Sequence, residues 1–333
     1  MATTSEDLLF VKALSVRFNK GRETVYAVND LTFSMKRGEL LAMVGESGCG
    51  KTVTCLSILR LNGQANTQGE ILFCGEDVLQ MGERDLRSLR GGRIAMVFQN
   101  PSSALNPVTT IGTQLTEVIR HHRRVSPQEA RAIAVEALRE LSVPSPEHKL
   151  QEYPHQQSGG TNQRIMIAMA LSCNPDLLLA DEPTASLDAT VQKQILGVFD
   201  RLKKTRQMGF LFVTHNLGVV FEIADRVMIL YQGMLMEEGK TQDIFANPLN
   251  PYTKALLSTV PFHGKHDITI AGEPPSPFVL PQGCPYAERC QERIGDVCWQ
   301  DRPRIVGQRR KVRCHWYDET VMGTGARKCA DNG

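Results

Sequence analysis

A glycine-rich stretch at residues 45–52, with the sequence GESGCGKT, has the residue types and the spacing of a phosphate-binding loop. It follows an apolar run typical of a buried strand and opens a run with helical spacing, which is the context such a loop requires. Its glycines allow consecutive backbone N–H groups to surround phosphates at a helix N-terminus. Lys51 is expected to reach the β- and γ-phosphates and Thr52 to bind Mg²⁺. The alternative is a strand–helix turn without a ligand.

A second candidate for chemistry is the acidic pair Asp181-Glu182, at the end of the apolar run DLLLADEP (176–183). Carboxylates at the carboxyl end of a buried parallel strand lie where the ligands of α/β sheets bind. Asp181 suits the surroundings of Mg²⁺, and Glu182 suits a general base that polarises the attacking water. Adjacent acids after a strand also occur in solvated turns, but the phosphate-binding loop favours the catalytic interpretation.

Two more polar residues stand at the ends of predicted strands. Gln99 in MVFQNP has an amide that can reach the metal or the lytic water, and His215 in FVTHN can contact the γ-phosphate. The sequence SLD at 186–188 lies just after Glu182. A lone Gln or His of this kind is normally structural, but here both stand in the order and at the strand ends of one ATPase architecture.

The elements that must position these residues alternate along the chain. Short apolar runs predict strands at 8–16, 31–35, 39–45, 176–183 and 209–215. The last three are continuously apolar, which is typical of a parallel sheet covered on both faces. Helical spacing occurs in TEVIRHHRR, PQEARAIAVEALREL and QRIMIAMALS, and residues 225–239 indicate a hairpin. The order predicts an α/β fold.

Composition bounds the class of protein. The 333 residues suffice for one large domain with a smaller appendage. A net charge of +2 gives no electrostatic reason to expect nucleic acid as a partner. No apolar run has the length of a membrane span, and the polar, acidic N-terminus is unlike a secretory signal. We therefore expect a cytosolic protein whose nine cysteines are reduced or metal-bound.

The composition changes after about Asn247, where prolines crowd into GEPPSPFVLP (272–281) and four cysteines follow. We expect a nucleotide-binding domain over residues 1–246 and an accessory extension over 247–333. Four of the five cysteines of this extension form the candidate set, namely Cys284, Cys290, Cys298 and Cys314. Four thiolates in a proline-rich segment with little core of its own suggest a metal staple. The spacing lacks a CxxC pair, which weakens the alternative of a zinc ribbon.

In order and context, these motifs resemble those of the ATP-binding subunits of ABC transporters, over roughly the first 250 residues. Gly45–Thr52 match the Walker A motif, Gln99 the Q-loop, Ser158–Gly160 the signature, Asp181 the Walker B aspartate, Glu182 the catalytic glutamate, Asp188 the D-loop and His215 the switch histidine. Phe18 falls where the family has an aromatic residue that stacks on adenine, and Tyr26 is a second candidate. The resemblance implies a RecA-like core, an antiparallel β subdomain and a helical subdomain at about 101–173.

The resemblance also implies the site residues. The expected contacts to ATP are Phe18, Gly45, Glu46, Ser47, Gly48, Cys49, Gly50, Lys51, Thr52, Val53, Gln99, Asp181, Ser158, Gly159, Gly160 and Asp188. Thr52, Gln99 and Asp181 are expected to hold Mg²⁺, and Glu182, His215 and Gln99 to take part in catalysis. Cys49 is interpreted as a small filler of the loop.

A narrower resemblance links the chain to the oligopeptide/dipeptide/nickel importer branch of this family. The segments that carry it are NPSSALNP, NPLNPYTKALL (247–257) and GCPYAERC (283–290). It implies that Cys284, Cys290, Cys298 and Cys314 hold a [4Fe–4S] cluster, with zinc or unligated thiols as the alternatives. Cys329 stands outside this set.

The signature stretch QQSGGTNQR (157–165) departs from the family pattern, because Gln157 replaces a leucine and Thr161 replaces a glutamine or methionine. In this family the signature loop closes over the ATP of a second subunit. If position 157 is buried, an unsatisfied amide there costs roughly 1–3 kcal/mol. We expect a loop that still binds, with a weakened clamp.

The sequence is therefore interpreted as an ATPase subunit of an ABC importer for peptides or similar small solutes, peripheral at the cytoplasmic face of the cell membrane. Expected partners are a second ATPase subunit, which the branch resemblance makes a paralogue, two transmembrane permease subunits and a periplasmic or extracellular solute-binding protein; nucleic acid is not expected. The alternative is a soluble ABC-type ATPase that remodels DNA or ribosomes. A single cassette without a long coiled-coil insertion disfavours it. A structural iron–sulfur or zinc module leaves the catalytic motifs unexplained.

Overall fold

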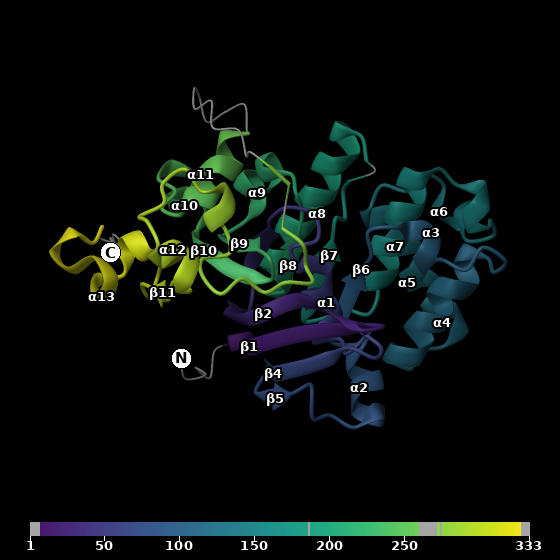
Figure 1. Cartoon of the computed structure of the whole chain (residues 1–333). Helices are drawn as coiled ribbons and strands as arrows, with labels where there is room; N and C mark the ends of the chain where they lie inside the picture. The colour runs from purple at the N-terminus through teal and green to yellow at the C-terminus, as the bar shows by residue number, and fades with distance from the viewer. Residues whose placement is uncertain (1–6, 186, 260–271, 274, 328–333) are drawn as a thin grey trace.

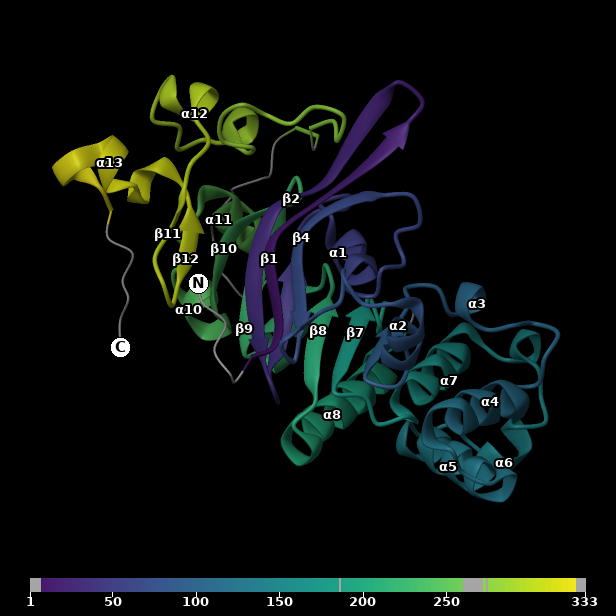
Figure 2. The same ribbon diagram turned by 90° about the horizontal axis from the view of Figure 1, so that it is seen from below.

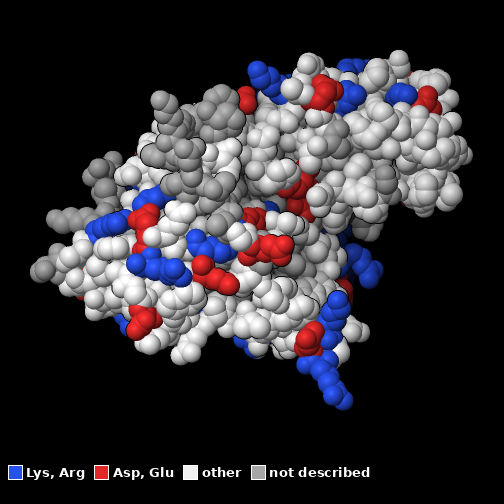
Figure 3. All heavy atoms as spheres, turned by 45° about the horizontal axis from the view of Figure 1, so that its top comes forward, with Lys and Arg blue, Asp and Glu red and all other residues white. Residues whose placement is uncertain are grey.

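The computed structural model describes residues 7–185, 187–259, 272–273 and 275–327 (Figure 1). The described residues form two β-sheets, a lobe of helices and a C-terminal extension, which confirms the predicted α/β fold class. The lobe and the extension lie at opposite ends of the molecule in both ribbon views (Figures 1 and 2). On the face shown in Figure 3, basic and acidic side chains are interspersed.

The smaller sheet is antiparallel and has the strand order β2-β1-β4-β5. Its strands are β1 (Asp7–Lys20), β2 (Glu23–Lys36), β4 (Asn66–Phe73) and β5 (Glu76–Asp77). Side chains such as Leu9, Val11 and Phe33 point from this sheet into a core shared with the larger sheet. The first two apolar runs of the sequence thus form the predicted antiparallel subdomain.

The larger sheet has the strand order β11-β12-β10-β9-β3-β8-β7-β6. Its strands are β3 (Leu40–Val44), β6 (Ile94–Val97), β7 (Leu177–Asp181), β8 (Gly209–Val213), β9 (Arg226–Tyr231), β10 (Met234–Lys240), β11 (Ile305–Val306) and β12 (Lys311–Arg313). The strands from β9 to β6 are parallel, and β9 and β10 form the predicted hairpin. Every residue of β3, β7 and β8 is buried, which explains their continuously apolar sequences.

Alternate residues of these strands face two separate cores. Leu177 and Leu179 of β7 pack toward α1 (Lys51–Ile58), α2 (Glu83–Leu89) and the small sheet. Leu178 and Ala180 pack toward the helical lobe and α8 (Ala189–Arg206). The edge near β9 and β10 is covered by α9 (Leu217–Ile223), α10 (Thr241–Ala246) and α11 (Pro251–Ser258). The parallel strands are therefore covered on both faces, as predicted.

The helical lobe is formed by a segment between β6 and β7. It contains α3 (Pro101–Ala104), α4 (Ile111–Arg123), α5 (Pro127–Glu140), α6 (Pro146–Lys149), the 3-10 helix η1 (Pro154–Gln156) and α7 (Gly159–Leu171). The start of α5 is fixed by a capping box, in which the Ser126 hydroxyl accepts from the N–H of Glu129 and the Glu129 carboxylate accepts from the N–H of Ser126. These helices fall within the range predicted for a helical subdomain.

The C-terminal extension is joined to the rest of the chain by a shared sheet. Beyond α11 it contains η3 (Ala287–Arg289), α12 (Val297–Gln300), β11, β12, η4 (His315–Tyr317), α13 (Glu319–Met322) and η5 (Gly323–Gly325). Strand β12 pairs with β10, so that the extension continues the larger sheet. Across this junction Arg310 donates to Glu237 (2.7 Å) and Lys311 donates to Glu238 (2.9 Å), and all four residues are buried.

In the part of the chain that the structure describes, no helix has both the length and the apolar character needed to cross a lipid bilayer.

Candidate nucleotide site

The phosphate-binding loop connects β3 to α1, which begins at Lys51. Two of its glycines pass close to other backbone segments. A Cβ atom on Gly45 would lie 2.2 Å from the carbonyl oxygen of Leu230, and one on Gly50 would lie 2.3 Å from that of Ala27. Gly50 also has a φ of 97°, which side chains rarely tolerate. Packing against β9 and β2 therefore requires glycine at both ends of the loop.

Lys51 closes the loop upon itself. Its Nζ donates to the carbonyl oxygens of Gly45 (2.7 Å) and Glu46 (2.9 Å). The thiol of Cys49 is buried in the same turn, 3.5 Å from this Nζ. The ammonium group is therefore held at the mouth of the loop, where it can exchange these carbonyl contacts for phosphate oxygens.

A pocket of about 470 Å³ brings most of the predicted site residues together. Its lining includes Phe18, Gly45, Ser47, Gly48, Gly50, Lys51, Thr52, Val53, Gln99, Asp181, Glu182 and His215. Val25, Ala27 and Pro277 also line it and were not predicted. Val25 and Ala27 carry no motif, and Pro277 comes from the extension, so that neighbouring sequence gave no signal for any of the three.

Asp181 is the last residue of β7 and is buried beside Thr52. Burial raises the pKa of the Asp181 carboxyl, and the negative charge of Glu182 adds to the rise. A hydrogen bond with Thr52 and the charge of Lys51 oppose it. A divalent cation between Thr52 and Asp181 would stabilise the ionised carboxylate, so the pair has the chemistry of a Mg²⁺ site.

Glu182 is held in one orientation by the strand end beside it. Its Oε1 accepts from the backbone N–H of His215 (3.1 Å) and lies 2.7 Å from Nδ1 of the same residue. Its Oε2 accepts from the Thr214 hydroxyl (3.4 Å). Glu182 has a φ of 49°, an uncommon value for a residue with a side chain. The strained backbone and the fixed carboxylate are features of a general base placed for a proton transfer.

Of the two aromatic candidates for the adenine, only Phe18 lines this pocket. Tyr26 lines a neighbouring cavity, and the guanidinium of Arg17 lies 5.3 Å from its ring centre. The backbone N–H of Tyr26 donates to the carbonyl oxygen of Pro277 (2.9 Å). Glu46 and Cys49 also line the neighbouring cavity rather than the nucleotide pocket.

The signature residues lie apart from the pocket, at the start of α7. Ser158 caps this helix, with its Oγ accepting from the N–H of Thr161 (3.2 Å). A Cβ atom on Gly159 would meet no described atom within 4 Å, so this glycine faces open space. Asp188 caps α8 and is likewise absent from the pocket lining. Ser186 of the predicted SLD motif lies outside the described residues, as does Cys329.

From the sequence, a buried Gln157 was considered to leave an unsatisfied amide, but the structure gives this amide hydrogen-bond partners. It is half-buried, and its Nε2 donates to the carboxylate of Glu152 and to the carbonyl oxygen of Tyr153. Thr161 is buried, and its hydroxyl is 3.0 Å from the Ser158 hydroxyl. Of the two unusual residues, Thr161 is therefore the one that contacts the signature serine.

Cys284, Cys290, Cys298 and Cys314 line one cavity of about 20 Å³, which is about the room that one water molecule needs. Burial raises the pKa of Cys284 and of Cys314 to about 12, and the neighbouring cysteines add to both shifts. His315 lines the same cavity, and its buried Nδ1 has no hydrogen-bond partner among the described residues.

The described side chains around this cavity do not have the geometry of a metal site. Among the described residues, no group of three or more His, Cys, Asp or Glu side chains is placed to hold a metal ion. The four thiols match a four-thiolate group in number and chemistry, but their positions do not. The predicted [4Fe–4S] cluster and the zinc alternative are thus not supported by the positions of these side chains.

Two family models match the chain. One, described as "ABC transporter", matches residues 28–185, and the other, "Oligopeptide/dipeptide transporter, C-terminal region", matches residues 236–298. The first contains the phosphate-binding loop, the signature and the acidic pair, and the second contains Cys284, Cys290 and Cys298.

Similar proteins cover most of the chain. The dipeptide transport ATP-binding protein DppD of Bacillus subtilis is 44% identical over 295 residues, which are 87% of this chain and 88% of that protein. The oligopeptide transport ATP-binding protein OppD of Salmonella typhimurium is 42% identical over 297 residues, with the same coverage of 87% and 88%. The dimeric, post-hydrolysis structure of the ATP-binding cassette MJ0796 bound to ADP and Pi has a TM-score of 0.65 at 27% identity, over 70% of this chain and 98% of that one.

Proposed function

The chain belongs to the ATP-binding subunits of ABC transporters, in the oligopeptide/dipeptide importer branch, and we propose that it hydrolyses ATP in the pocket at residues 45–53 with Glu182 as the general base. As a member of this family it is an ATPase that converts ATP and water to ADP and phosphate. Its relatives are peptide-transport proteins, so that hydrolysis energises the import of peptides or similar small solutes. This assignment is favoured over a DNA- or ribosome-remodelling ATPase.

The observation that carries the proposed site is the convergence of two strand ends on one helix N-terminus. Lys51 and Thr52 begin α1, Asp181 ends β7 and Glu182 follows it, yet all four line a single pocket. In our proposal Lys51 and the loop N–H groups bind the phosphates, and Thr52 and Asp181 hold Mg²⁺ together with Gln99. Glu182 then accepts a proton from the attacking water.

We further propose that each ATP is shared between two chains. Ser158 and Gly159 lie at the exposed start of α7, away from the pocket of their own chain. A second ATPase subunit facing this surface would receive the helix N-terminus and the Ser158 hydroxyl at its γ-phosphate. The dimeric MJ0796 cassette with ADP and Pi supports this arrangement by similarity. The partner subunit is proposed to be a paralogue.

The same family supports the remaining partners. Two transmembrane permease subunits and a periplasmic or extracellular solute-binding protein are proposed to complete the importer, with this chain at the cytoplasmic face of the membrane. The helical lobe at 101–173 is the proposed docking site for the permease. We propose residues 1–246 as the ATPase domain and 247–333 as the branch-specific extension.

For the extension, we propose that Cys284, Cys290, Cys298 and Cys314 hold a [4Fe–4S] cluster, zinc being the alternative. The support is that thiols from four separate segments line one cavity. When bound, such a cluster would supply thiolate cross-links between segments that have few strands or helices of their own.

The experiment that tests the proposed function is nucleotide binding by the full-length chain. Lys51→Ala should lose most of its affinity for a fluorescent ATP analogue with Mg²⁺, because the loop then lacks its cation. Lys12→Ala is the matched control, since Lys12 forms an exposed ion pair with Glu70 on the small sheet. Equal affinity of Lys51→Ala and the control would show that residues 45–53 are not the nucleotide site.

A further inference from the structure

Residues of the C-terminal part of the chain form hydrogen bonds with Glu46 in the phosphate-binding loop. The backbone N–H of Glu46 donates to the hydroxyl of Tyr252 in α11 (3.1 Å). The carboxylate of Glu46 accepts two hydrogen bonds from Arg289 at the end of η3, from Nη1 (2.8 Å) and Nη2 (3.1 Å). Arg289 also donates to the hydroxyl of Tyr231 (3.0 Å). Backbone and side chain of one loop residue are thus both fixed by distant segments.

The ion pair between Arg289 and Glu46 is largely removed from water. The side chain of Arg289 is 6% exposed and that of Glu46 is 19% exposed. Two parallel N–H···O bonds from a guanidinium are stronger and more directional than a single neutral hydrogen bond. Because the pair is buried, removing one partner leaves a poorly solvated charge, which is a much larger change than breaking a surface ion pair.

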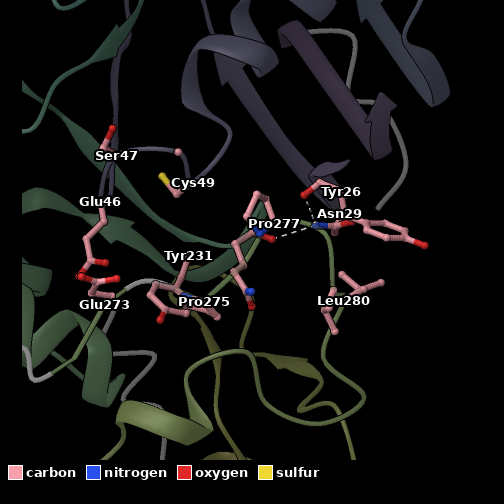
Figure 4. Close-up of a pocket in the computed structure, with 13 residues that line it drawn as sticks. Tyr26, Asn29, Glu46, Ser47, Cys49, Tyr231, Glu273, Pro275, Pro277 and Leu280 are labelled. Atoms are coloured by element: carbon pink, nitrogen blue, oxygen red, sulfur yellow. Dashed lines mark hydrogen bonds between the residues drawn. The ribbon is translucent and has the colours of Figure 1, made fainter. Parts of the chain in front are cut away.

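This charge pair lies directly behind the nucleotide pocket. Glu46 and Ser47 line a second cavity of about 460 Å³ (Figure 4). Ser47 and Gly48 line both this cavity and the nucleotide pocket. The carbonyl oxygen of Glu46 also accepts from Lys51 Nζ, so that the loop backbone links the ion pair to the phosphate-binding cation. A second carboxylate, that of Glu273, lines the same cavity. Without Arg289, negative charge would accumulate next to a loop that must bind a polyanion.

We propose that Arg289 is a positioning residue for the nucleotide: it neutralises Glu46 and holds residues 45–48 in the form that binds phosphates. Arg289 makes this contribution through Glu46 and does not line the nucleotide pocket itself. The inference rests on the proposed function, because it assigns a role in ATP binding at the same loop. It also makes the extension a part of the nucleotide site, since Arg289 is 43 residues beyond position 246 and directly precedes Cys290.

The test compares nucleotide affinity in single and double variants of the full-length chain. Arg289→Gln should raise the dissociation constant of a fluorescent ATP analogue with Mg²⁺ about tenfold, which corresponds to about 1.4 kcal/mol. Adding Glu46→Gln should restore most of the affinity, because both charges are then removed and two amides remain to bond.

A matched control is Arg293→Gln, because Arg293 is exposed in the same segment and contacts Trp299. It should bind as the wild type does. Thermal unfolding of each variant shows whether the fold is intact. The inference fails if Arg289→Gln binds like Arg293→Gln, if Glu46→Gln gives no rescue, or if the single and double variants are both unfolded, since Arg289 would then serve the fold alone.

The proposed function and the inference fail in different ways. Loss of affinity in Lys51→Ala together with normal affinity in Arg289→Gln would overturn only the role of Arg289. Normal affinity in Lys51→Ala would overturn the nucleotide site on which the inference rests.

Discussion

The nucleotide pocket and the cysteine cavity differ in how firmly hydrogen bonds and strands hold the side chains that line them. In the pocket, Lys51 and Glu182 have hydrogen-bond partners that fix their positions, and so has Ser158 of the signature, which lies apart from the pocket. In the cavity, four thiols surround about 20 Å³, and the Nδ1 of His315 has no partner among the described residues. The first site stands on buried parallel strands, whereas the second is built from turns and short helices.

The difference indicates which site depends on its occupant. Strand ends fix side chains through the sheet itself, and Asp181 ends β7, which pairs with the buried strand β8. The cysteine segments lack such a frame and would gain order from cross-links. The Arg289 contact connects the two regions, because it reaches the phosphate-binding loop from the residue before Cys290.

The largest effect is expected in the pocket itself. Glu182→Gln should reduce the ATPase rate of the chain with its partner subunit by about 10²–10⁴-fold, because an amide keeps the shape but cannot accept the proton. Binding of the ATP analogue should remain. Glu136→Gln, an exposed residue of the helical lobe, serves as the control. Near-normal turnover of Glu182→Gln would place the general base elsewhere.

A second comparison concerns the metal content of the extension. Chain purified without oxygen should be brown and contain about four iron and about four acid-labile sulfide atoms if a cubane cluster is present. Cys298→Ser should bleach it, while Cys173→Ser, which changes a buried cysteine between α7 and β7, should not. A colourless chain with about one zinc would support the alternative, and a metal-free chain would indicate unligated thiols.

The attachment of the extension to the sheet can be tested separately from its cysteines. Arg310 donates to the fully buried carboxylate of Glu237, whose oxygens also accept from the backbone N–H groups of Leu249 and Asn250. Arg310→Gln should lower the free energy of unfolding by about 3 kcal/mol, because it leaves a buried carboxylate without its cation. Arg309→Gln, at the exposed neighbouring position, should change it by less than about 0.5 kcal/mol. A metal-free preparation should show the same difference between the two variants.

The sequence was most informative where function restricts residue types. The loop at 45–52 and the pair Asp181-Glu182 were located from their types and their position after apolar runs, because phosphates and Mg²⁺ accept few alternatives. The α/β class and the hairpin at 225–239 followed from periodicity in the same way. Burial on both faces made the central strands recognisable.

Contacts between distant segments could not be read in the same way. Nothing near Pro277 or Arg289 indicates that these residues reach the phosphate-binding loop, since the contact depends on how the extension folds back. The pairing of β12 with β10 involves only three residues of β12, too few for a periodic signal. The Gln157 amide is likewise hydrogen-bonded to Glu152, a partner that the spacing of residues in the sequence does not identify.

The smallest effect is expected at the two unusual residues of the signature. Gln157 is satisfied by Glu152, so Gln157→Leu should leave the ATPase rate of the reconstituted transporter nearly unchanged. Thr161 differs, because its hydroxyl lies 3.0 Å from that of Ser158, the group proposed to contact the ATP of the partner subunit. When the two chains close, the Ser158 hydroxyl must exchange its contact with Thr161 for a contact with this ATP. A hydrogen bond of this kind is worth about 0.5–1.5 kcal/mol. Thr161→Met should therefore raise the rate by about two- to tenfold. Equal rates for wild type, both single variants and the double variant would show that neither residue weakens the clamp.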